Sequence, residues 1–127
     1  MAGLTLDAGV LISAGRNERK TWALIREANR RGEVFTIPAA VLAQVWREPP
    51  EVRMARLVGN CNIDSLDERS AKEAGALAGR AGVADAVDAS VVVSASHRGD
   101  AVVTGDIGDL GLLAEAAGGV RMIPIPR

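Results

Sequence analysis

The chain has 127 residues, of which 48% are hydrophobic and 24% charged, so it fits one globular domain and is not a disordered chain. Its single cysteine, Cys61, excludes an internal disulfide framework and fits a reducing compartment. The formal net charge of −1 neither indicates nor excludes a nucleic-acid partner. We find no signal peptide and no apolar run long enough to span a membrane, and therefore expect a single cytoplasmic domain over residues 1–127.

The first half of the chain alternates between short apolar strands and amphipathic helices. In the stretch 18–31, Trp22, Ile25 and Ala28 recur every third residue, which predicts a helix with one buried face. Trp46, at similar helical spacing, is interpreted with Trp22 as a packing or dimer-contact residue. The strands expected here are 4–6, 34–37 and 61–63, and the helices are 9–14, 18–31, 41–46 and 51–58.

The second half continues the alternation. Asp67 is a suitable N-cap for a helix over 68–80, and Asp85 opens a helix that runs to about Arg98 and stops at Gly99. The remaining elements expected are a strand at 101–104, a helix at 109–117 and a closing strand at 120–123. This order predicts an α/β three-layer sandwich with a mostly parallel sheet.

Basic residues are concentrated in one early stretch of the chain. One interpretation is a solvated helix face, and the other is a surface that guides phosphates. The residues are Arg16, Arg19, Lys20, Arg26, Arg30 and Arg31.

Acidic residues follow two of the predicted strands, at the edge where parallel α/β sheets bind ligands. Asp7 closes the first strand, and Asp106 comes two residues after Thr104 ends the fourth. Asp85 and Asp88, three residues apart, start the helix that leads into that fourth strand. We therefore expect a cluster of carboxylates at this edge.

Clustered carboxylates repel one another, so their pKa values rise unless a cation joins them. Magnesium prefers oxygen ligands, usually binds one or two carboxylates, and accepts waters and phosphate oxygens as its other ligands. Such an ion can orient a water and stabilise a phosphoryl group under attack. The pattern therefore predicts a phosphodiesterase.

Each aspartate also has a structural interpretation. Asp7, Asp85 and Asp106 can each cap a helix, and Asp109 is favourable in the first turn of the last helix.

Other chemistries are not indicated. With one histidine, His97, and one cysteine, a zinc site of the usual ligands is not expected, and His97 fits a surface or capping role. No nucleophilic triad or glycine-rich phosphate loop is present. Tyrosine is absent and Phe and Trp total three residues, so an aromatic platform for RNA is not expected.

Three motifs resemble a known family, the PIN-domain ribonucleases, and among them the VapC-type toxins of VapBC toxin–antitoxin systems. Leu-Thr-Leu-Asp-Ala-Gly-Val-Leu-Ile at 4–12 resembles the first motif of the family. Val-Asp-Ala-Ser-Val-Val-Val-Ser-Ala at 87–95 resembles its acidic helix, and Val-Val-Thr-Gly-Asp at 102–106 resembles its closing motif. In order and spacing, the likeness covers nearly the whole chain.

This resemblance implies a Mg²⁺- or Mn²⁺-dependent endoribonuclease that hydrolyses RNA phosphodiesters with metal-activated water. It also implies a homodimer and inhibition by a cognate antitoxin. The catalytic and metal-binding residues that it implies are Asp7, Asp88 and Asp106, with Asp85, Asp109 and Thr104 in possible supporting roles.

One departure stands at Gln44, where the family usually has a glutamate on the helix after the second strand. Glutamine keeps an oxygen acceptor but brings no charge, and Asp85 is a candidate to supply it. The alternative function is a catalytically weak or inactive PIN-like module that binds RNA or protein. A phosphoacceptor receiver domain is disfavoured, because Lys20 and Lys72 are the only lysines and a late one is missing.

Overall fold

Five short strands form a single sheet in the order β3–β2–β1–β4–β5, and all four pairings are parallel. The structure is a computed structural model and describes residues 3–126. The strands are β1 (Leu4–Leu6), β2 (Phe35–Pro38), β3 (Asn62–Asp64), β4 (Ala101–Thr104) and β5 (Met122–Pro124).

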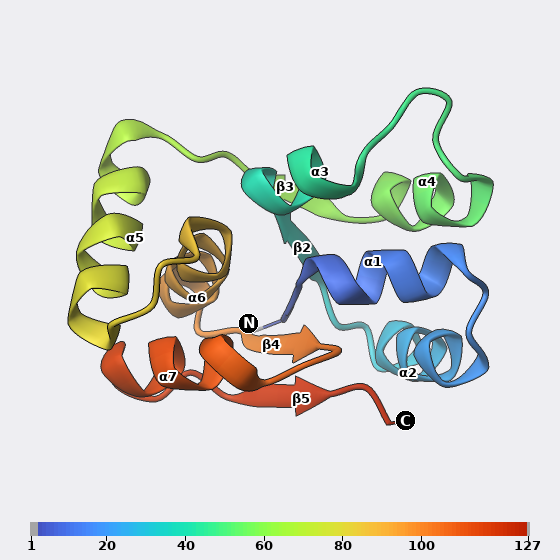
Figure 1. The fold of residues 1–127 in the computed structure, drawn as a ribbon. Helices are drawn as coiled ribbons and strands as arrows, with labels where there is room; N and C mark the ends of the chain where they lie inside the picture. The colour runs from blue at the N-terminus through green and yellow to red at the C-terminus, as the bar shows by residue number, and fades with distance from the viewer. Residues whose placement is uncertain (1–2, 127) are drawn as a thin grey trace.

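Helices cover both faces of this sheet. Figure 1 shows α1, α2 and α4 on one side of the strands and α5, α6 and α7 on the other. The helices are α1 (Ala8–Gly15), α2 (Arg19–Arg30), α3 (Ala39–Val45), α4 (Val52–Gly59), α5 (Glu68–Ala81), α6 (Ala86–Arg98) and α7 (Gly108–Ala116). The predicted three-layer α/β sandwich is confirmed, with a sheet that is wholly rather than mostly parallel.

The ends of the helices follow from local chemistry in the sequence. Asp67 accepts a hydrogen bond of 2.8 Å from the Ser70 N–H and so caps α5. Gly82 and Gly99 end α5 and α6 with φ angles of 69° and 71°, in the left-handed region where glycine has no Cβ penalty. The predicted cap at Asp67 and the predicted stop at Gly99 are confirmed.

Helix α6 is the most deeply enclosed helix of the described chain. Every residue from Ala89 to Ala95 is buried, because α6 packs against the sheet, α5 and α7 at once. Each fully buried valine side chain, such as Val91 or Val92, contributes roughly 1.5–3 kcal/mol to folding. No helix within residues 3–126 has both the length and the apolar character to cross a membrane.

A buried charge network holds the C-terminal end of α6. The Asp100 carboxylate, whose side chain is 3% exposed, accepts hydrogen bonds from the Gly3 N–H at 2.7 Å, the Thr5 hydroxyl at 2.9 Å and Arg98 Nε at 3.0 Å. Arg98 also donates to the Thr5 hydroxyl at 2.7 Å and to Asp64 at 3.0 Å. This network, which we call the Arg98 network, ties α6 to β1, β3 and the start of β4.

Replacing Asp100 with alanine should strongly destabilise the fold. Arg98 would lose its more deeply buried carboxylate partner, and breaking such a pair costs on the order of 3 kcal/mol. Urea denaturation followed by circular dichroism measures the free energy of unfolding. Glu68→Ala is the matched control, because it removes a carboxylate from an exposed pair with Lys72 and should have a much smaller effect. Equal losses in the two variants would contradict this account.

Candidate metal centre

The site lies where the strand order reverses, at the C-terminal ends of β1 and β4. The chain passes from β1 to β2 and β3 on one side, then returns to β4 on the other side of β1. Leu6 is in register with Val103, and the Asp7 N–H donates to the Val103 carbonyl at 3.2 Å. The residues that follow the two strands are therefore neighbours, at the position where parallel sheets bind ligands.

Asp7 is buried, with 8% of its surface exposed. Its Oδ1 accepts a hydrogen bond of 3.2 Å from the Val10 N–H, so it caps α1 while its carboxylate lies at the sheet edge. Burial raises the pKa of Asp7, and the charge of Asp106 adds to this, against hydrogen bonds from Thr104 and the backbone of Val10 and Gly9. The capping and functional interpretations of Asp7 are thus compatible.

Asp106 is positioned by the turn that follows β4. The buried Thr104 hydroxyl accepts from the Asp106 N–H at 3.0 Å and donates to the Asp106 carbonyl at 2.8 Å. The capping alternative for Asp106 is wrong, because α7 begins after Ile107 and no side chain caps it. The Asp106 carboxylate is exposed and forms no hydrogen bond or ion pair with residues 3–126, so it is available to a ligand.

Asp85 and Asp88 come from the start of α6, which runs opposite to the strands. Asp85 caps the helix by accepting from the Asp88 N–H at 3.0 Å, as expected. Partial burial, and after it the charges of Asp85, Asp7, Asp109 and Asp106, together raise the pKa of Asp88 to about 6. These five residues therefore act on one another electrostatically, and we call them the acidic edge.

The acidic edge is not a closed metal cage. Within residues 3–126, no three carboxylate, imidazole or thiol side chains already lie close enough together to enclose an ion. The donors are nevertheless hard oxygens, and magnesium commonly binds one or two carboxylates while it retains several waters. The mutual repulsion at Asp88 is relieved by a cation. The chemistry of the donor set thus fits a hydrated magnesium or manganese ion.

The other predicted residues lie as follows. Gln44 is exposed near the end of α3, and no hydrogen bond joins it to the acidic edge within the described chain. In the basic stretch, Arg30 and Arg31 both pair with Glu27, which supports a solvated face for that part of α2. His97 is exposed and contacts Glu73 at 2.7 Å, which confirms its surface role.

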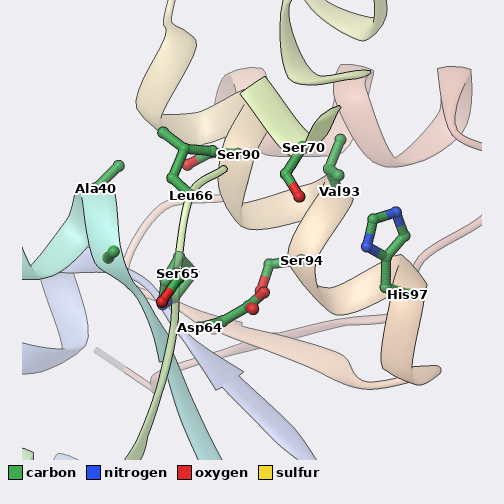
Figure 2. A pocket seen from close by; sticks show the side chains of 11 residues that line it. Ala40, Asp64, Ser65, Leu66, Ser70, Ser90, Val93, Ser94 and His97 are labelled. Carbon is green, nitrogen blue, oxygen red and sulfur yellow. The ribbon is translucent and has the colours of Figure 1, made fainter. Parts of the chain in front are cut away.

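A polar pocket between α3, α5 and α6 was not indicated by the sequence. Figure 2 shows Ser70, Ser94 and His97 around it, with Asp64 at its base. Ser94 donates to Asp64 at 2.5 Å, and Arg98 binds the same carboxylate oxygen. Because Asp64 is shared, the pocket adjoins the Arg98 network. Its interior volume of about 10 Å³ is roughly the space of one water molecule.

Comparison with known proteins gives a match in structure but not in sequence. No protein-family model and no curated protein matches the chain. The VapBC2 complex of Rickettsia felis, bound to a promoter DNA fragment, contains a similar chain with a TM-score of 0.73 and 12% identity, covering 97% of this chain and 98% of that one. A DNA-bound VapBC of Salmonella typhimurium matches with a TM-score of 0.70 and 18% identity, over 99% and 100% of the two chains.

A toxin–antitoxin complex of Klebsiella pneumoniae matches with a TM-score of 0.70 and 16% identity, over 98% of this chain and 99% of that one. At these identities the likeness concerns the fold. The fold expected from the sequence motifs is therefore confirmed along nearly the whole chain.

Asp88→Asn should stabilise the metal-free protein, and more so near neutral pH than in mild acid. Because the pKa of Asp88 is raised from 3.8 to about 6, the folded state binds more protons than the unfolded state at pH values between these two pKa values. Stability from the protonated form is therefore lost as the pH rises through this range. Thermal denaturation in EDTA at both pH values measures the effect.

The control is Glu115→Gln, which removes an exposed carboxylate from α7 away from the acidic edge. A gain for Asp88→Asn that does not depend on pH would contradict the assigned repulsion.

Proposed function

We propose that this chain, which has the fold of chains from VapBC toxin–antitoxin complexes, is a metal-dependent endoribonuclease and the toxin of a type II toxin–antitoxin pair. The observation that carries the nuclease proposal is the acidic edge. Asp7, Asp88 and Asp106 come from three separate segments, and their charges converge where a parallel sheet binds ligands. Such a concentration of negative charge at a sheet edge favours the binding of a cation.

In this proposal Asp7, Asp88 and Asp106 hold a Mg²⁺ or Mn²⁺ ion, directly or through water. When bound, such an ion lowers the pKa of a water and offsets charge on a phosphodiester, which are the requirements of RNA hydrolysis. The acidic residues alone repel RNA, so a bound metal also strengthens substrate binding.

The other residues of the site orient these ligands. The Val10 N–H donates to Asp7 Oδ1 and so orients the carboxylate. Thr104 fixes the turn that presents Asp106, through two hydrogen bonds to its backbone. Asp85 caps α6 and adds negative charge next to Asp88, and Asp109 adds charge from α7.

The proposal includes a cognate antitoxin and a homodimer. Two of the similar structures are VapBC assemblies bound to DNA, and the third is a toxin–antitoxin complex. An antitoxin that covers the acidic edge would block access of RNA to it. A cytoplasmic location fits an RNA substrate and the single cysteine.

The first test is cleavage of structured RNAs by the purified, partner-free protein with magnesium, with manganese and with EDTA. Wild type should cleave only with metal, and Asp88→Asn and Asp7→Asn should reduce the rate by more than about 100-fold, the upper range for loss of an outer-shell partner. Asn also caps helices well, so Asp7→Asn should keep α1 folded.

Asp67→Asn is the matched control, since it makes the same change at the N-cap of α5. Equal cleavage by Asp67→Asn and Asp88→Asn would count against the assigned site.

A second candidate is a PIN-like module that binds RNA or protein without cutting it. Two observations favour it: Gln44 brings no charge, and the described side chains do not form a closed metal cage. Metal binding by calorimetry without turnover on any RNA would support this candidate, whereas metal-dependent cleavage that Asp7→Asn abolishes would exclude it.

Gln44→Glu should lower the magnesium concentration needed for half-maximal cleavage by several-fold, because it adds a carboxylate where the family usually has one. Gln44→Ala should leave that concentration nearly unchanged.

Asp85→Asn keeps the helix cap but removes a charge next to Asp88, so it should raise the magnesium requirement. Full activity and metal affinity in Asp85→Asn would refute a compensating role for this residue.

A further inference from the structure

A groove runs alongside the acidic edge, between α1 and the loop that follows β4. Two glycines, Gly9 and Gly105, line it, and their backbones approach closely: a Cβ on Gly9 would lie 3.6 Å from the Gly105 nitrogen. The same Cβ would lie 3.5 Å from Asp7 Oδ1, so the end of the groove at Gly9 lies next to one candidate metal ligand. Its volume is about 250 Å³. Because glycines without side chains line part of the groove, an extended polymer can lie in it next to the carboxylates.

Arg16 is the only cation that lines this groove among the described residues. It follows α1 directly as the C-cap residue and is exposed. Its guanidinium forms no hydrogen bond or ion pair with the described chain, whereas Arg30 and Arg31 are engaged by Glu27. The other charged residue of the groove, Glu18, accepts a hydrogen bond of 3.1 Å from the Ser13 hydroxyl. Arg16 is thus an unpaired cation beside an anionic site.

We infer that this groove is a subsite for the RNA backbone, and that Arg16 binds a phosphate adjacent to the one at the acidic edge; this inference rests on the proposed function. Guanidinium groups bind phosphate oxygens through paired, charge-assisted hydrogen bonds. The aspartates of the acidic edge repel RNA phosphates that do not contact the metal. A nearby cation offsets this repulsion. Ile12, 42% exposed on the groove wall, offers an apolar contact for a ribose or base.

RNA is favoured over an acidic protein segment as the occupant because of the continuity of the groove. Gly9 joins the groove to Asp7, so a ligand held by Arg16 extends directly toward the candidate metal ligands. An RNA strand can bind Arg16 with one phosphate and the metal with the next. This makes Arg16 a substrate-binding residue.

The test is binding of a fluorescein-labelled RNA stem–loop in EDTA, measured by fluorescence anisotropy over a series of salt concentrations. Arg16→Gln should raise Kd about 10-fold and should reduce the slope of log Kd against log salt by about 0.7, the value for one phosphate contact on a single strand. Arg16→Lys should keep the slope near that of wild type. Arg80→Gln, the same charge change on α5 in a different groove, should leave both values nearly unchanged.

Cleavage assays with magnesium separate this inference from the proposed function. If both hold, Arg16→Gln raises KM and leaves kcat nearly unchanged. Wild-type RNA binding without cleavage would overturn the nuclease function, while the Arg16 comparison in EDTA still decides the subsite. Cleavage with the same salt slope and KM in wild type and Arg16→Gln would overturn the subsite alone, leaving the groove to a protein partner. Failure of wild type to bind the RNA would overturn the subsite as well.

Discussion

The position of α6 depends on one buried carboxylate, Asp100, at the edge of the sheet opposite the acidic edge. Asp100 joins the start of β1, the start of β4 and the end of α6 through Gly3, Thr5 and Arg98. A helix of 13 residues is roughly 20 Å long, so fixing its end by the Arg98 network fixes Asp88 at its other end. Polar pairing at one edge and apolar packing between the edges thus determine where the candidate ligands meet.

The repulsion within the acidic edge destabilises the fold, whereas the Arg98 network and the packing of α6 stabilise it. Burial and four neighbouring carboxylates raise the pKa of Asp88 to about 6, so its ionised form costs free energy near neutral pH. The packing around Ala89–Ala95 holds the helix in place despite this cost. A site that is strained in this way gains more from a cation than an isolated carboxylate does, because binding also relieves the repulsion.

The sequence predicted the elements well because their boundaries depend on local chemistry, such as the Asp67 cap and the Gly99 stop. It also indicated Asp7 and Asp106, because residues that follow parallel strands share one edge, and Asp88, because it starts the helix that leads into β4. Their role as metal ligands stays a prediction. The Arg98 network was not indicated, since it joins residues as distant as Thr5 and Arg98. Arg16 was indicated as part of the basic stretch, but the groove that it forms with Gly9 and Gly105 was not. Strand order and side-chain reach decide such contacts, and no periodic pattern encodes them.

Asp7 meets two requirements with one side chain, since it caps α1 and lies among the carboxylates. Asparagine or serine would satisfy the helix but bring no charge. Glutamate would bring the charge on a longer side chain, which places the carboxylate differently. In the proposed function, position 7 therefore has to meet the demands of the helix cap and of the metal at once. At α6 the two requirements are divided, with the cap on Asp85 and the more strongly perturbed carboxylate on Asp88, so each of those positions answers to fewer demands and has more freedom to vary.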